Sequence, residues 1–246
     1  MLKLALLPMV GLLFLAGCAV GNQHAYHLVS PRLTHTGRVA VVVAVHDQRP
    51  YVVDGKKTPD FVGLSRGGFG NSFDVTTVSE RPLAADVADR VAGALSAAGY
   101  QAKVIRADHK MTSTKIMDAM VKSGAPRLVV VQLEEWKSDT YNNTALAYSV
   151  TVRVFDSKRA LLGISTINGR DDLGGSFMNP PAHAKEAVPP AYQSKLEELL
   201  NDPKIVHALQ ETPAPATPEP TTPAEPAAPT APEPAAPVAE AQRDMS

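Results

Sequence analysis

Side chains that could bind an anion are gathered between residues 47 and 81. Two of them stand at the end of an apolar run, and a third, an arginine, comes directly before a glycine-rich stretch. Glycine allows backbone turns that expose amide groups, and an arginine beside such a turn can bind a phosphate or a carboxylate. Loops longer than about 12 residues in compact domains are usually functional or disordered. The candidate binding residues are Asp47, Arg49, Arg66, Gly67, Gly68, Phe69 and Asn71.

Two simpler interpretations of this segment remain open. A phosphate-binding loop runs from a strand straight into a helix and ends in a lysine, whereas here about ten residues separate Asn71 from the next helical pattern. The glycines therefore fit a hairpin turn better, with strands drawn from residues 62–64 and 73–78. Asp47 and Arg49 could likewise form a local polar lock with neighbouring backbone at the exit of a buried strand.

Acid–base chemistry finds little support in the sequence. Glu134 and Glu135 are adjacent in a predicted strand and should point to opposite faces, unless a β-bulge intervenes. A hydrolase that uses Asp47, His46 or Glu134 would lack a Gly-x-Ser-x-Gly elbow as well as the His-Glu-x-x-His and Cys-x-x-Cys patterns. The spacing of His24 and His27 could suit a metal, but no third ligand is nearby. We therefore predict no catalytic residue, no metal and no cofactor.

One aromatic residue precedes a polar stretch, residues 138–143, that is predicted as a hairpin turn, and a second lies within it. They are Tyr141 and Trp136, the only tryptophan in the chain. Aromatic side chains that are exposed at a hairpin tip are candidates for contact with a partner. Trp136 could equally cap the end of the core.

The apolar periodicity predicts the elements that would position these side chains. Residues 38–46 are apolar at alternate positions on both faces, which predicts a central strand covered on both sides. Residues 82–98 repeat apolar side chains every four positions, as in an amphipathic helix. Further strands are predicted at 100–105, 127–136, 146–154 and 160–167, and further helices at 112–122 and 191–200. This order, β-α-β-α-β-β-β-α, predicts a mixed α/β (α+β) single domain with one mixed sheet.

The N-terminal residues predict export. Lys3 precedes about eleven apolar or small residues, which is the layout of a secretory signal. Residues 15–18, Leu-Ala-Gly-Cys, resemble the lipobox of bacterial lipoproteins; this implies that a signal peptide, residues 1–17, is removed and that Cys18 is acylated. Several acyl chains make a stable anchor, because each buried methylene contributes roughly 0.8 kcal/mol. An uncleaved membrane-spanning helix and an ordinary buried thiol are the alternatives for this segment.

Composition divides the rest of the chain. Residues 18–37 are polar and predict a lipidated arm, and residues 38–211 predict the globular domain. Residues 212–246 contain ten prolines and ten alanines, which predicts a disordered tail. The chain has one cysteine, so acylation of Cys18 leaves none for a disulfide. A formal net charge of −1 gives no basis for nucleic-acid binding.

The lipobox, the strand ending in Asp-Gln-Arg-Pro at residues 47–50, the Val-Gly pair at 62–63 and the alanine-rich helix together resemble the YajG-type family of bacterial lipoproteins. The resemblance covers roughly residues 38–171 and implies an envelope lipoprotein with a small mixed fold, not an activity. Ala19 after the cysteine, by resemblance to lipoproteins of Gram-negative envelopes, implies the outer membrane; the inner membrane or the cell surface is the alternative.

We expect a non-catalytic lipoprotein that is anchored in the outer membrane, faces the periplasm and binds an envelope protein or a cell-wall component. The alternative is an auxiliary lipoprotein of an envelope transport system that binds lipid or another small ligand. The sequence does not predict an oligomeric state.

Overall fold

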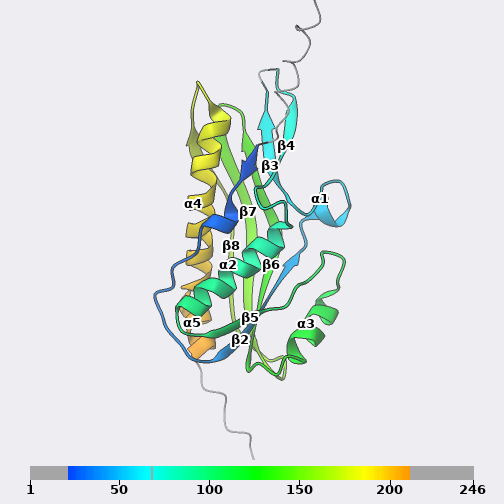
Figure 1. The fold of residues 1–246 in the computed structure, drawn as a ribbon, viewed down its shortest axis with the longest axis vertical. Coiled ribbons are helices and arrows are strands. Elements are labelled where there is room, and N and C mark those ends of the chain that lie inside the picture. The colour runs from blue at the N-terminus through cyan, green and yellow to red at the C-terminus, as the bar shows by residue number, and fades with distance from the viewer. Residues whose placement is uncertain (1–21, 68, 211–246) are drawn as a thin grey trace, which may run out of the picture. The chain divides into compact units, whose positions relative to one another are not determined.

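The computed structural model describes residues 22–67 and 69–210 (Figure 1). The predicted signal peptide, Cys18, Gly68 and the tail at 212–246 lie outside the described residues. The strands are β1 (Gln23–His24), β2 (Ala40–Asp47), β3 (Phe61–Arg66), β4 (Ser72–Thr77), β5 (Gln101–Val104), β6 (Arg127–Thr140), β7 (Asn143–Asp156) and β8 (Leu161–Gly175). The helices are the 3-10 turn η1 (Tyr26–Leu28), α1 (Pro50–Val53), α2 (Leu83–Ala97), α3 (Ser113–Val121), α4 (Pro180–Leu200) and α5 (Pro203–Gln210).

Strand β6 organises the sheet because it pairs with three other strands. Along one edge it pairs antiparallel with β7, from Arg127 opposite Asp156 to Thr140 opposite Thr144. Its other edge is shared, since the first half pairs parallel with β2 and the last three residues pair parallel with β3. β5 lies beyond β2, β4 and β1 lie beyond β3, and β8 lies beyond β7. These eight strands form one mixed sheet, which confirms the predicted fold class.

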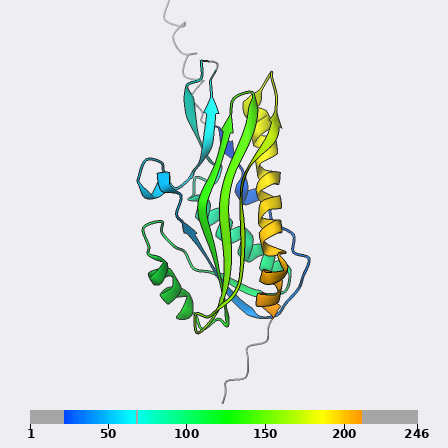
Figure 2. The same cartoon turned by 180° about the vertical axis from the view of Figure 1, so that it is seen from behind.

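The two faces of the sheet are covered by different helices. Helices α2, α4 and α5 pack on the inner face, where Val41, Val43 and Val45 join the main core. Helix α3 packs on the outer face over Val42 and Ala44. Strand β2 is therefore apolar on both sides because both sides are covered, as its sequence predicts. In Figure 2 the long strands are seen from the other side, and α3 lies beside their lower end.

Several elements are longer than predicted. β6 continues to Thr140 and β8 to Gly175, so residues 138–140 belong to a strand instead of a turn. Helix α4 begins at Pro180 instead of residue 191 and contains Pro189 and Pro190. Proline removes a helical hydrogen bond and usually ends a helix, so the first part of α4 could not be predicted from the sequence. Burial of α4 side chains in the main core stabilises it despite the prolines; these include Val188, Tyr192 and Leu196.

The segment predicted as a long loop between β2 and α2 is largely regular structure. It contains α1 and the β3–β4 hairpin, which is the hairpin interpretation left open from the sequence. Gly63 is needed where β3 meets β6, because a Cβ atom there would lie 2.6 Å from the backbone oxygen of Ser138. The hairpin thereby extends the sheet beyond the end of β2.

Residues 22–37 pack against the domain instead of forming the predicted arm. β1 pairs parallel with β4, and the Tyr26 side chain is fully buried in the main core. Its ring lies 4.8 Å from that of Tyr192 and makes an edge contact with it. These contacts could not be predicted from the sequence, because the segment is polar and one buried tyrosine does not produce a repeating apolar pattern. The domain therefore begins no later than Asn22.

The buried histidine of β1 makes the stability of the domain depend on pH. His24 is 1% exposed and its Nε2 lies 3.1 Å from the Ser138 hydroxyl. Burial, and then the charge of Lys185, lower the pKa of His24 from 6.5 to about 4. As the pH falls from 6.5 to about 4, the unfolded chain binds a proton that the folded domain excludes. We expect the free energy of unfolding to fall by about 3 kcal/mol as the pH drops through this window. Above pH 6.5 the contribution of His24 to the free energy of unfolding should no longer change with pH.

Denaturation measured between pH 7 and 4 tests this expectation. His24→Gln should reduce the slope, and the lowered pKa values of the buried His35 and His46 should account for part of what remains. The control His109→Gln, in the loop before α3, should keep the full slope. An unchanged slope in His24→Gln would show that the acid sensitivity originates elsewhere.

Candidate functional site

Asp47 and Arg49 form a buried lock and not an open anion site. Asp47 lies on the same face of β2 as Val45, and its carboxylate accepts hydrogen bonds from Arg49 Nε at 2.8 Å and Nη2 at 2.7 Å. The guanidinium also donates to the backbone oxygens of Phe61, at 2.5 Å, and Pro59, at 3.0 Å. Burial alone would lower the pKa of Arg49, but hydrogen bonding and charge attraction from Asp47 raise it. The pair fixes the chain between β2 and β3, which is the local interpretation.

The glycine-rich residues make the turn of the β3–β4 hairpin. The Gly67 amide donates to the Asn71 oxygen at 2.8 Å, and Gly70 has a φ of +80°, where a side chain would be strained. Arg66 makes a two-pronged ion pair with Asp139 of β6, with both N···O distances 2.7 Å. Hydrogen bonds from Arg66 lower the pKa of Asp139. Arg66 therefore joins two strands at the rim of the sheet, and Asn71 closes the turn.

The predicted aromatic pair is split between the core and the surface. Trp136 is 2% exposed and its Nε1 donates to the Tyr26 hydroxyl at 3.0 Å, so it belongs to the core, while Tyr141 is 47% exposed. A β-bulge between Leu133 and Glu135 produces this outcome. An extra residue in one strand turns every following side chain to the other face, so the bulge moves Trp136 from the outer face to the inner one.

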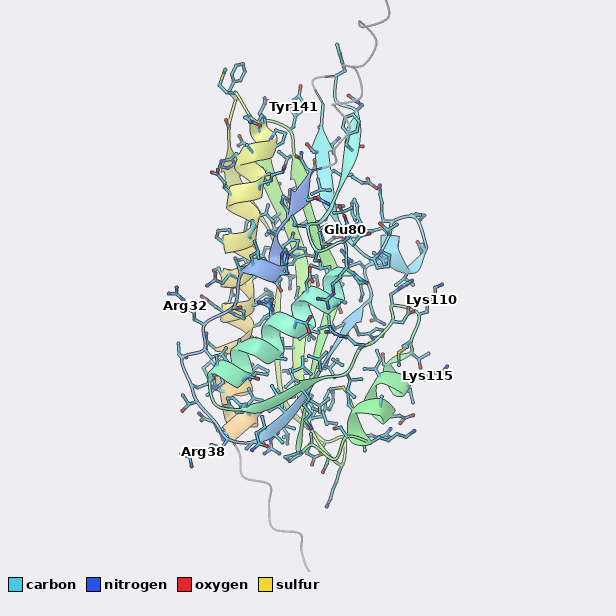
Figure 3. All side chains as sticks on the ribbon, viewed as in Figure 1. Arg32, Arg38, Glu80, Lys110, Lys115 and Tyr141 are labelled. Carbon is cyan, nitrogen blue, oxygen red and sulfur yellow. The ribbon has the colours of Figure 1, made fainter. Side chains whose placement is uncertain are left out.

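Three turns and the beginning of β4 form an apolar surface at one end of the domain, which joins Phe69 and Tyr141, both candidates from the sequence, to side chains that were not predicted. Its members are large exposed side chains, which we call the tip surface: Phe69, Phe73, Tyr141, Phe177 and Met178. Phe69 is 103% exposed, and Phe177 and Met178 are 88% exposed. Phe177 and Met178 stand between a glycine pair and a proline pair, and this signal marks an exposed turn. Figure 3 labels Tyr141 at this end.

A pocket of about 260 Å³ lies on the outer face, between α3 and the sheet. We call it the α3 pocket. Its apolar lining consists of Ile116, Met117, Val130 and Phe155, and its polar lining of His46, Ser113, Gln132 and Arg153. Arg153 Nη1 donates to Gln132 Oε1 at 2.5 Å. Among the described residues, no carboxylate lies within ion-pair distance of Arg153, so a positive charge borders an apolar hollow.

Polar side chains continue from the pocket along the outer face. Gln132 Nε2 donates to Gln48 at 2.6 Å and to Glu134 at 3.2 Å, and the Ser149 hydroxyl donates to Glu134 at 2.8 Å. Glu135 instead accepts a hydrogen bond of 2.9 Å from the Tyr51 hydroxyl. The β-bulge lies at these two glutamates, so they need not point to opposite faces of the strand as a regular strand would require. Their side chains nevertheless bind different partners.

The residues considered for hydrolysis are not brought together. Asp47 faces inward and is held by Arg49, whereas His46 faces the α3 pocket, where burial lowers its pKa. Within the described ranges, no group of three His, Cys, Asp or Glu side chains could hold a metal ion.

The sequence does contain a match to the nucleophile-elbow pattern that was expected to be missing. Residues 63–67 read Gly-Leu-Ser-Arg-Gly, which matches the Gly-x-Ser-x-Gly pattern of nucleophile elbows. An elbow needs a strand that turns sharply into a helix and exposes the serine. Ser65 instead lies within β3, is buried, and accepts a hydrogen bond of 2.8 Å from Asn22. The match is therefore a strand sequence and not an elbow.

The sequence matches no model of a known protein family and no curated protein. The fold is similar to protein XCC0632 from Xanthomonas campestris, of family DUF330, with 12% identity and a TM-score of 0.47 over 72% of this chain and 91% of that chain. It is also similar to PelC from Paraburkholderia phytofirmans, a dodecamer, with 19% identity, a TM-score of 0.34 and coverage of 67% and 92%. Lipoprotein GNA1162 from Neisseria meningitidis matches with 13% identity, a TM-score of 0.25 and coverage of 64% and 99%. The resemblance to the YajG-type family stays a prediction.

None of the helices in the described part of the chain is long and apolar enough to span a membrane. The described chain begins at Asn22, whose side chain contacts Ser65 of β3, and ends with α5 at the end of the domain opposite the β3–β4 turn (Figure 1).

Proposed function

We propose that the protein is a non-catalytic lipoprotein, acylated at Cys18 in the outer membrane, whose domain faces the periplasm and binds an envelope protein or a cell-wall component. The α3 pocket is the observation that supports a binding role. It combines an apolar floor with one cation and several polar groups, which is the usual chemistry of a recognition pocket. The pocket lies in the half of the domain farther from the tip surface, on the sheet face that the described helices leave most open.

The chemistry of the pocket indicates the kind of group that it takes. Arg153 and Gln132 offer hydrogen-bond donors at the rim, and a guanidinium forms strong charge-assisted hydrogen bonds with a carboxylate. The partner would therefore place an acidic group against Arg153 and an apolar group against α3.

Photo-crosslinking in cells tests this proposal. Ile164 stands opposite Arg153 on β8 and is 37% exposed, so a photoreactive residue placed there reports on the pocket rim. We expect a defined crosslinked product that Arg153→Gln reduces roughly tenfold, the usual loss for a charge-assisted hydrogen bond. The control Arg38→Gln, an exposed arginine at the other side of the domain, should leave the product unchanged (Figure 3). A product that is equally strong in both variants would contradict the proposal.

The apolar lining of the pocket favours a second candidate function, an auxiliary lipoprotein of a transport system that binds lipid or a small ligand. A volume of about 260 Å³ holds a short amphipathic molecule and not a long acyl chain. Native mass spectrometry of the protein from membranes separates the two functions. A reproducible added mass that Arg153→Gln removes supports the second candidate, and a ligand-free mass supports the first.

A further inference from the structure

We propose that the tip surface inserts into the headgroup region of the bilayer that carries the acyl anchor, so that the domain stands upright with the α3 pocket turned toward the periplasm. This inference rests on the anchoring at Cys18 in the proposed function. Single exposed apolar residues are normal on a protein surface, but a cluster of them marks a contact surface. Five of the ten exposed large hydrophobic side chains among the described residues belong to this cluster.

Strand register places the three turns of the tip surface at one level. Ser65 stands opposite Thr140, so the β3–β4 turn and the β6–β7 turn lie at the same end of the sheet. Asn143 stands opposite Gly175, and the Ser176 amide donates to the Asn142 oxygen at 3.2 Å. The loop that carries Phe177 and Met178 therefore begins at the level of the β6–β7 turn. Figures 1 and 2 both show these turns at the upper end.

The chain that leads to the anchor enters the domain at the same end. Asn22 Nδ2 donates to Ser65 Oγ at 2.8 Å, and the Asn22 oxygen accepts from the Thr76 amide at 3.1 Å. Cys18 precedes Asn22 by four residues, and an extended chain covers about 3.3–3.6 Å per residue, so Cys18 can be no more than roughly 14 Å away. Phe69 of the tip surface is likewise four residues from Ser65, the residue that Asn22 contacts. The acylated cysteine can therefore reach the plane of the tip surface.

The chemistry of the tip surface suits a membrane interface. Tyr141 combines an apolar ring with a polar hydroxyl, as do the aromatic residues that concentrate at the headgroup level of bilayers. Phenylalanine is among the apolar side chains that peripheral proteins bury at the boundary between headgroups and acyl chains. The charged residues behind them are of both signs, namely Arg66 and Arg170 with Asp139, Asp171 and Asp172. Attraction to anionic lipid is therefore weak, and burial of the apolar side chains provides the contact. A second contact beside an acyl anchor turns a flexible tether into a fixed orientation.

Lipid quenching of a fluorophore on the acylated protein tests the orientation. Cys18 is the only cysteine and is blocked when acylated, so Phe177→Cys or Phe69→Cys supplies a single reactive thiol. The labelled protein is reconstituted in vesicles of phosphatidylcholine and phosphatidylglycerol that contain nitroxide-labelled phosphatidylcholine. The matched control is Leu161→Cys, which is 51% exposed at the opposite end of β8.

We expect the nitroxide lipid to quench most of the fluorescence at positions 177 and 69 and to leave that at position 161 unchanged. Vesicle-bound protein whose tip labels remain unquenched would overturn the inference while leaving the anchor intact. Tip labels that are shielded from aqueous iodide but not quenched by lipid would show a protein contact, such as a second copy, and would also overturn it. Protein that fails to attach to vesicles would instead remove the anchoring itself.

Discussion

Replacing Asp47 with alanine is expected to lower the free energy of unfolding by about 3–5 kcal/mol. The substitution leaves the Arg49 guanidinium fully buried, with the oxygens of Phe61 and Pro59 as acceptors but without its countercharge. A buried charge without its partner is costly because the interior solvates it poorly. Urea denaturation measures the loss. The exposed pair of Asp54 and Lys56, at 52% and 74% exposure, provides the control, and Asp54→Ala should cost less than about 1 kcal/mol.

A double variant separates loss of the charge pair from loss of packing. Asp47→Leu with Arg49→Met removes both charges and keeps apolar volume, so it should be more stable than Asp47→Ala alone. If Asp47→Ala costs no more than the surface control, the lock contributes little and the connection between β2 and β3 is held by other contacts.

Replacing Trp136 with alanine is expected to cost about 3–5 kcal/mol, because it empties the centre of an aromatic cluster. The Trp136 ring makes edge contacts with Tyr26 and Tyr192 at centroid distances of 6.3 and 5.6 Å. The change also takes away the hydrogen bond from Trp136 Nε1 to the buried Tyr26 hydroxyl. Thermal and urea unfolding followed by circular dichroism measure the loss without the tryptophan signal.

Tyr141→Ala is the matched control, since Tyr141 is the exposed member of the pair predicted from the sequence. It should change stability by less than about 0.5 kcal/mol. Equal losses in the two variants would contradict the assignment of Trp136 to the core and Tyr141 to the tip surface.

The elements with strong periodicity could be predicted from the sequence. The valines of β2 indicate a strand that is covered on both faces, and the apolar repeat of α2 indicates a helix on the sheet. Helix α4 could not be found this way, because Pro189 and Pro190 interrupt the pattern that packing against the sheet restores. A local sequence pattern cannot predict an element whose conformation depends on contacts with residues far away in the sequence.

The candidate site shows the same limit. The Asp47–Arg49 lock and the glycine turn were both open as local interpretations, since their partners are near in sequence. The position of Trp136 depends on a β-bulge, and the tip surface depends on the register between β3, β6 and β8. A single sequence gives no clear signal for strand register or for a β-bulge. The α3 pocket and the tip surface could therefore be found only in the structure.

The intact mass of the protein purified from membranes tests the central claim, that an acylated Cys18 anchors a binding domain in the envelope. We expect a chain that has lost residues 1–17 and gained a diacylglycerol and a further acyl chain on Cys18, with Cys18→Ser released from the membrane fraction. An unmodified Cys18, or a chain that keeps residues 1–17 and remains in the membrane fraction after Cys18→Ser, would contradict it.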